Sequence, residues 1–189
     1  MTPDEARALM HDWTASRALR THMEAVAACM AAYAEMQEPD QRDRWVVAGL
    51  LHDFDYERHP SREQHPFTGV DHLRQRGDVD EEVLDAILGH ADYSGTPRVT
   101  PMQKSLFAVD ELAGFIIACA KVRPTGIEDL EPRSVRKKLK DKGFAAAVSR
   151  EDIRRGIEEL GVSEDEHIAR CIAAIRDRLT PSQIAGKDA

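Results

Sequence analysis

One stretch, Trp45 to Glu57 (WVVAGLLHDFDYE), constrains the fold more than any other part of the chain. Its apolar run from Trp45 to Leu51 predicts a buried helix, and the run ends directly on His52 and Asp53. Burying an ionised carboxylate without a partner costs much free energy, so the partner is usually a cation and often a metal. On a regular helix His52 and Asp53 point about 100° apart, so both can face one ion only if the helix ends there.

Composition limits the class of protein. The chain of 189 residues is long enough for one domain with a sizeable core, and its net charge of −8 argues against general binding to nucleic acid or anionic membranes. No apolar stretch approaches the roughly 20 residues of a membrane span, and the N-terminus lacks a signal-peptide core. Cys29, Cys119 and Cys171 lie far apart in apolar contexts, which predicts buried thiols of a reducing compartment. We therefore expect a cytoplasmic protein, with its oligomeric state open.

Helix-start signals are frequent and strand signals are nearly absent, so the sequence predicts an all-α fold. Capping boxes with a following proline begin helices at Thr2 and at Thr100. The helix that ends at the His-Asp pair is expected to have Asp40 as its N-cap and Asp43 in its first turn. Further helices are expected over 16–36, from His65 to Gly77, from a box at Asp78 and Glu81 to His90, from Thr100 to Lys121, over 134–142, and after Ser149 and Ser163.

Several polar side chains fall on the apolar faces of these helices. His22 lies on a stripe with Leu19 and Val26, and His90 on a stripe with Val83 and Ile87. Asp110 lies in the middle of an apolar face of the long helix. A single inward histidine can be a hydrogen-bonded core residue, but one such group on each of four helices is harder to explain that way. Imidazole and carboxylate together suit a borderline divalent metal.

The other histidines have weaker signals. His65 begins a helix, so its side chain has access to the same site. His59 lies in a polar turn, where it is either a proton donor or simply solvated. His72 is expected to be a packing or surface residue, and His11 and His167 are expected on the surface because their helices are highly charged.

In chain order these residues are His22, His52-Asp53, His65, His90 and Asp110, and their order and helical context resemble the HD-domain superfamily of metal-dependent phosphohydrolases, in its HDIG-like branch. The resemblance implies a single compact helical bundle over 1–189, with an HD core at about 16–121 and a C-terminal helical extension at about 122–180. Many members continue after the dyad with Ile-Gly and a basic residue, whereas this chain continues Phe54-Asp55-Tyr56-Glu57. The substrate preference of those members therefore does not carry over.

The resemblance also implies a ligand set and a chemistry. In that superfamily the first histidine, the dyad and the final aspartate hold one metal, and two further histidines, matched here by His65 and His90, hold a second. Asp53 would then bridge two divalent ions such as Mn, Fe, Zn, Ni or Co. The implied reaction is hydrolysis of a phosphoester of a small molecule or nucleotide by metal-activated hydroxide.

Candidate residues for the remaining tasks follow from position and charge. Besides Asp53, the candidate catalytic residues are Asp55 and His59, with Asp55 also a possible acceptor for a ligating imidazole. Phosphate needs positive neighbours, for which the candidates are Arg123, where the chain turns, Lys104 and Lys137. Lys137 belongs to the basic segment 133–142, which is otherwise an ordinary solvated face.

Two rival functions use the same fold. Some HD-domain proteins of similar size are di-iron oxygenases, but the phosphonate-cleaving branch has a tyrosine and a glutamate just ahead of its first histidine, and no tyrosine precedes His22 here. A non-catalytic nucleotide-binding module would show missing ligands, and none of the six is missing. The sequence therefore favours an enzyme with a small phosphorylated substrate and no nucleic-acid or membrane partner.

Overall fold

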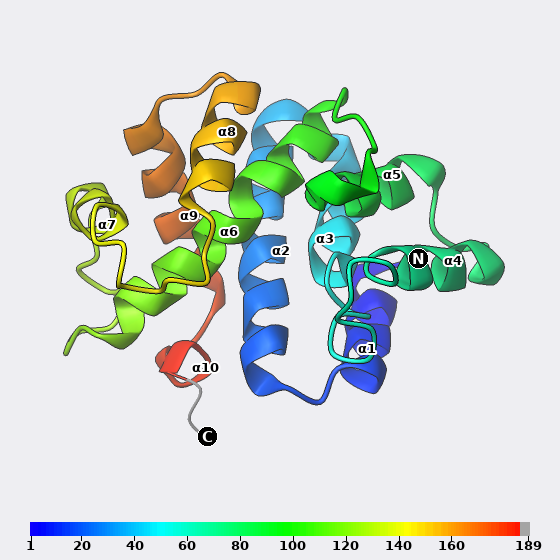
Figure 1. Ribbon diagram of the computed structural model, residues 1–189, viewed down its shortest axis with the longest axis horizontal. Helices are drawn as coiled ribbons and strands as arrows, with labels where there is room; N and C mark the ends of the chain where they lie inside the picture. Colours follow the sequence, from blue (N-terminus) through cyan, green and yellow to red (C-terminus); the bar gives the residue numbers. More distant parts are fainter. Residues whose placement is uncertain (186–189) are drawn as a thin grey trace.

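The computed structural model describes residues 1–185, which form ten α-helices and two short 3-10 helices without any strand (Figure 1). This confirms the predicted all-α fold. The elements are α1 (Pro3–Trp13), α2 (Arg17–Gln37), η1 (Pro39–Gln41), α3 (Arg42–Leu51), α4 (Phe67–Arg76), α5 (Glu81–His90), η2 (Asp92–Ser94), α6 (Pro101–Lys121), α7 (Pro132–Leu139), α8 (Arg150–Leu160), α9 (Glu164–Arg178) and α10 (Pro181–Ala185).

The two longest helices, α2 and α6, pack against each other in the middle of the molecule. Figure 1 shows α1, α3, α4 and α5 on one side of this pair and α7, α8 and α9 on the other. On the first side α3 packs on α2 and α5 packs on α6, and on the second side α8 packs on α6 and α9 on α2. One hydrophobic cluster extends from Ala6 in α1 to Ile184 in α10. The predicted boundary at residue 121 between a core and an extension stays a prediction, and this cluster crosses it.

A glycine brings α2 and α3 unusually close. A Cβ atom added to Gly49 would lie 2.6 Å from the Cα atom of Ala27 and 2.8 Å from its backbone nitrogen. Any larger residue would therefore push the two helices apart, because close-packed backbone cannot yield locally. Since His22 lies on α2 and His52 follows α3 directly, this close approach sets the separation of the two imidazoles.

Most of the predicted helix starts are confirmed. Thr2 and Thr100 form complete capping boxes with Glu5 and Gln103. Ser16, Ser149 and Ser163 each accept a hydrogen bond from a backbone N–H three residues later, so they are N-caps as expected.

Two predicted caps are wrong. Asp40 lies inside η1, and α3 begins after Gln41 without a side-chain cap, although Asp43 is in the first turn as predicted. The cap of α5 is Asp80, which accepts from the Val83 N–H at 3.3 Å, and not Asp78. Asp78 instead forms an ion pair with Arg76 at 2.8 Å. The short helix α10 was not predicted, and the basic helix α7 begins at Pro132, before the expected residue 134.

The three cysteines, Cys29, Cys119 and Cys171, are buried and free, as predicted. No helix within residues 1–185 has both the length and the apolar character needed to cross a membrane.

Candidate metal centre

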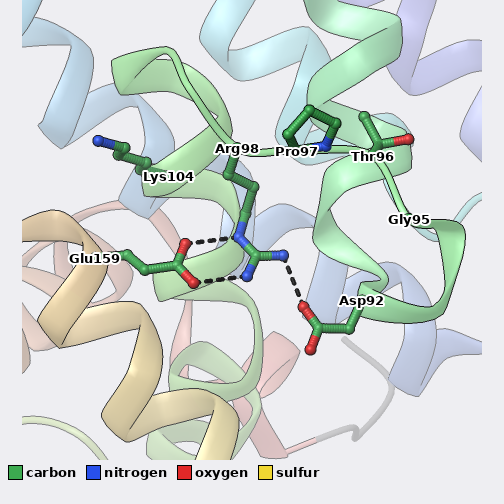
Figure 2. Close-up of a pocket in the computed structure, with 7 residues that line it drawn as sticks. All are labelled: Asp92, Gly95, Thr96, Pro97, Arg98, Lys104 and Glu159. Atoms are coloured by element: carbon green, nitrogen blue, oxygen red, sulfur yellow. Dashed lines mark hydrogen bonds and ion pairs between the residues drawn. The ribbon is translucent and has the colours of Figure 1, made fainter.

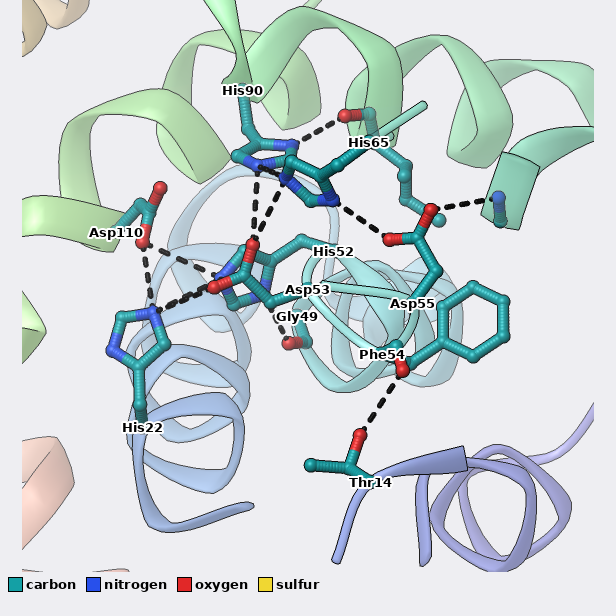
Figure 3. A network of polar contacts seen from close by, with 12 residues as sticks. Thr14, His22, Gly49, His52, Asp53, Phe54, Asp55, His65, His90 and Asp110 are labelled. Atoms are coloured by element: carbon teal, nitrogen blue, oxygen red, sulfur yellow. Dashed lines mark hydrogen bonds and ion pairs between the residues drawn. The ribbon is translucent and has the colours of Figure 1, made fainter. Parts of the chain in front are cut away.

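Six side chains from five parts of the chain converge at one place, and they are the six that the sequence identified (Figure 3). They come from α2, the turn after α3, the residue pair before α4, the last residue of α5 and the middle of α6: His22, His52, Asp53, His65, His90 and Asp110. The expectation about the end of the central helix is also met, because α3 stops at Leu51 and the chain continues in turns. Both His52 and Asp53 can therefore face the same centre.

The first group of ligand atoms surrounds one oxygen of Asp53. The Nε2 atoms of His22 and His52 lie 3.1 Å apart, and they lie 3.7 Å and 3.5 Å from Asp53 Oδ2. Asp110 Oδ1 completes the group, at 3.0 Å from His22 Nε2 and 3.4 Å from His52 Nε2.

The second group surrounds the other oxygen of the same carboxylate. Asp53 Oδ1 lies 3.3 Å from His65 Nε2 and 3.4 Å from His90 Nε2, and these two nitrogens are 3.3 Å apart. One carboxylate therefore joins two sets of donor atoms. Two groups are compact enough to hold one ion each: His22, His52 and Asp53, and Asp53, His65 and His90.

The far nitrogen of three imidazoles is fixed by a hydrogen bond. His52 Nδ1 contacts the Gly49 carbonyl oxygen at 2.8 Å, and His90 Nδ1 contacts the Ile87 carbonyl oxygen at 2.5 Å. A carbonyl oxygen can only accept, so each Nδ1 carries the hydrogen. In the neutral ring, the lone pair is then on Nε2 and points into the cluster, which is the arrangement that a metal requires.

Asp55 fixes the third imidazole. Its Oδ1 accepts from His65 Nδ1 at 2.7 Å, and its Oδ2 accepts from the Gly69 N–H at 2.8 Å. A Cβ atom added to Gly69 would lie 2.8 Å from Asp55 Cγ, so only glycine allows this approach. Asp55 is almost fully buried with both oxygens engaged. Its contacts are therefore those of an acceptor that orients a ligating histidine, the second of its two predicted roles.

The electrostatics of the cluster favour a cation. Burial alone would lower the pKa of His52, but the charges of Asp53 and Asp110 raise it to about 9. Burial would likewise lower the pKa of His65, but Asp53 and Asp55 outweigh this effect and raise that pKa to about 9. Burial disfavours the charged carboxylates, yet the neighbouring histidines hold the pKa of Asp53 and of Asp110 well below the usual range. The carboxylates stay ionised, and protons or metal ions must balance them.

The donor set fits a divalent transition metal. Four imidazole nitrogens and two carboxylates are borderline ligands of the kind that Zn, Fe, Mn, Co and Ni accept. Three of the nitrogens are already in the tautomer that presents a lone pair to the centre. The residues present therefore fit one ion in each group.

The three predicted phosphate-binding cations lie elsewhere. Lys104 lines a separate cavity of about 460 Å³ with Arg98 and Glu159, and none of the six ligand-type side chains lines it (Figure 2). Arg123, beyond the C-terminal end of α6, forms an ion pair with Asp129 at 2.6 Å. Lys137 is exposed on α7, on the opposite side of the molecule from α4 and α5. A phosphate at the centre would need other positive neighbours.

Arg98 connects the end of α5 to α8, a role that the sequence did not suggest. It donates to the Gly89 carbonyl oxygen at 2.9 Å, directly before the ligand His90, and pairs with Glu159 of α8 at 2.7 Å (Figure 2). Helix α8 therefore helps to hold the end of α5.

The remaining histidines divide as follows. His72 packs against Trp13 with ring centroids 4.6 Å apart, and His11 is exposed, as expected for both. His59 lies 6.3 Å from the Trp13 ring, and its role as proton donor stays a prediction. The surface position predicted for His167 is wrong, because this side chain is fully buried between Tyr33 and the Ala108 carbonyl oxygen. Its place on the apolar stripe with Ile168 and Cys171 was the available signal.

A family model described as "HD domain" matches residues 19–180 of the chain. The chain belongs to the HD domain family. The match contains all six ligand-type residues of this HD domain and continues beyond Lys121 through α7, α8 and α9. No curated protein and no solved structure matches the sequence significantly.

Proposed function

We propose that this HD domain is a metal-dependent phosphohydrolase that cleaves small phosphate esters. The proposal rests on the position of the Asp53 carboxylate, whose two oxygens face two separate sets of imidazole nitrogens. Two ions bridged by one carboxylate are an arrangement suited to displacement at phosphorus.

The ligands divide between two ions. His22, His52 and Asp110 would hold one ion, His65 and His90 the other, and Asp53 would bind both. When bound, such ions polarise a phosphate oxygen and lower the pKa of a coordinated water. The protein's own part is to hold the donor atoms in place, through Gly49, Ile87 and Asp55 behind three of the imidazoles.

The charge of the ligand set supports an anionic substrate. Asp53 and Asp110 contribute two negative charges, and the four histidines are neutral when they bind a metal. Two divalent ions would leave the centre with a net positive charge, even when the buried carboxylate of Asp55 behind His65 is counted as well. This positive charge would attract the anionic phosphate of an ester.

The six ligand-type side chains differ in exposure. The side chains of His22, Asp53 and Asp110 are 17–19% exposed, whereas those of His52, His65 and His90 are at most 5% exposed. A substrate therefore approaches along Asp53, the residue that both groups share.

The test is a screen of phosphorylated metabolites with metal-loaded protein, without dioxygen or reductant, in which released phosphate is measured. We expect turnover of at least one phosphate monoester and its loss in Asp53→Ala. His11→Ala is the matched control, because His11 is an exposed histidine on α1 outside the cluster.

Two other outcomes would contradict the proposal. Turnover that requires dioxygen and ferrous iron would show a di-iron oxygenase instead. A metal-loaded protein that turns over neither class of substrate, yet binds a nucleotide, would be a binding module.

A further inference from the structure

Three residues that the sequence did not single out lie next to the segments that supply the second group of ligands: Tyr56, Arg62 and Tyr93. Arg62 lies in the turn region three residues before the ligand His65, and Tyr93 lies in η2 three residues after the ligand His90. The two segments that supply His65 and His90 thus also supply Arg62 and Tyr93.

One ring contact joins Arg62 to Tyr93, and another joins Tyr56 to the ligand His65. The Arg62 guanidinium carbon lies 5.4 Å from the centre of the Tyr93 ring, which is within the range of a cation–π contact. The Tyr56 ring packs edge-to-face on the His65 imidazole, with centroids 5.1 Å apart. Tyr56 and Tyr93 are 45% and 42% exposed, so both present large unburied faces to solvent.

The charge of Asp53 also acts on Tyr93. Burial and then the negative charge of Asp53 raise the pKa of the Tyr93 hydroxyl above its ordinary value, and Arg62 acts in the opposite direction. Tyr93 therefore lies within the electric field of both the shared ligand and the guanidinium.

Arg62 also differs from most arginines of this protein in having no acidic partner. Arg44, Arg58, Arg98 and Arg123, for example, each pair with a carboxylate. Within residues 1–185, Arg62 forms no ion pair, so its guanidinium remains available for an anion. A planar guanidinium binds two phosphate oxygens at once, which a point charge cannot do.

We propose that Arg62, held against the Tyr93 ring, binds the phosphate group of the substrate at the metal centre. Tyr56 and Tyr93 then flank the organic part of the ester. This inference rests on the proposed phosphohydrolase function. It gives the phosphate the positive neighbour that Lys104, Arg123 and Lys137 do not supply from their positions.

The test uses the metal-loaded full chain and two readouts, the dissociation constant for inorganic phosphate by calorimetry and KM against kcat for an ester that the wild type hydrolyses. In Arg62→Ala we expect the phosphate dissociation constant and KM to rise about 10- to 100-fold, because the variant loses a hydrogen bond to a charged group. Arg62→Lys should bind phosphate more tightly than Arg62→Ala but less tightly than the wild type, because lysine keeps the charge but lacks the paired donors of the planar guanidinium. Metal content should be unchanged in both variants.

Arg154→Ala is the matched control, since Arg154 is an exposed arginine on α8 that pairs with Glu158 of the same helix. If the wild type binds phosphate and hydrolyses esters while Arg62→Ala behaves like the control, the assignment of Arg62 is overturned and the proposed function stands. If the metal-loaded wild type neither binds phosphate nor hydrolyses any ester, the proposed function fails and the assignment of Arg62 fails with it.

Discussion

Two buried clusters of this protein contain histidine, and their surroundings give the imidazoles opposite charge preferences. In the metal centre, nearby carboxylates outweigh burial and raise the pKa of His52 and of His65 to about 9. Between α2, α6 and α9, burial dominates and lowers the pKa of His167 to about 4. Burial of a histidine therefore does not by itself indicate a ligand, whereas burial beside carboxylates creates a site that favours a cation.

The two clusters also differ in which imidazole nitrogens have hydrogen-bond partners. The Nε2 atom of His167 donates to the Ala108 carbonyl oxygen at 3.0 Å, so its Nδ1 accepts from the Tyr33 hydroxyl at 2.5 Å. Both nitrogens are thus satisfied within the protein. In the metal centre only the outer nitrogens of His52, His65 and His90 are satisfied by ordinary acceptors, and the inner ones face each other and Asp53.

The largest expected effect is that of Asp53→Ala, which removes the residue shared by both ligand groups. We expect the variant to lose both ions and all hydrolytic activity, because each remaining group lacks its common carboxylate. Metal analysis by mass spectrometry measures this. Asp43→Ala changes an exposed acid at the start of α3, the helix that precedes Asp53, and this control should keep its metal. Full occupancy in Asp53→Ala would contradict the assignment.

The next effect should be confined to one half of the centre. Asp55→Asn keeps the shape of the side chain but removes the charge that orients and polarises His65. We expect the affinity for the second ion to fall about 10- to 100-fold while the first ion stays bound. Metal titration of the metal-free protein resolves the two affinities. Glu57→Gln serves as control, because Glu57 is exposed in the same turn region and accepts from the Ser16 N–H. An equal loss of both ions in Asp55→Asn would mean that the halves are not separable.

Only some residues of the centre could be predicted from the sequence alone. His22, His90 and Asp110 were predictable because they lie inside regular helices, where spacing decides which face a residue occupies. The pairing of Asp55 with His65 and Gly69 depends on the path of the turn region between α3 and α4, for which no periodic pattern exists. The same holds for Arg62 and Tyr93, which meet because the turn region before α4 lies beside the short 3-10 helix η2.

The fold shows a similar limit. Capping boxes at Thr2 and Thr100 gave correct helix starts, since the motif satisfies the backbone locally. Asp80, and not Asp78, is the N-cap of α5. Arg76 pairs with Asp78, and Arg44 from α3 pairs with Asp80. The second of these contacts is tertiary and cannot be read from local sequence.

In the other cluster, His167→Leu should change stability without changing the metal centre. The substitution leaves the Tyr33 hydroxyl without its histidine partner and the Ala108 carbonyl without this donor, at a cost of roughly 1–3 kcal/mol in the free energy of unfolding. Denaturant unfolding measures this cost. Metal content equal to that of the wild type is the companion expectation, and a loss of metal would contradict the separation of the two clusters.

The smallest expected effect is the pH dependence of that difference. Because the folded state lowers the pKa of His167 to about 4, the unfolded chain binds more protons below its pKa of about 6.5. The stability that this group contributes is therefore present above pH 6.5 and lost as the pH falls towards 4. We expect the stability advantage of the wild type over His167→Leu to shrink by about 1–2 kcal/mol between pH 7 and pH 5. An advantage that grows on acidification would have the wrong sign for a buried neutral imidazole.

The central claim, that one carboxylate joins two separable metal sites, is tested most directly by the ratio of metal to protein in three proteins: wild type, His65→Ala and His90→Ala. We predict two ions per chain in the wild type and about one in each variant, because His22, His52 and Asp110 remain around Asp53 Oδ2. A wild-type ratio of one that neither variant changes would contradict the claim and show that His65 and His90 are not metal ligands.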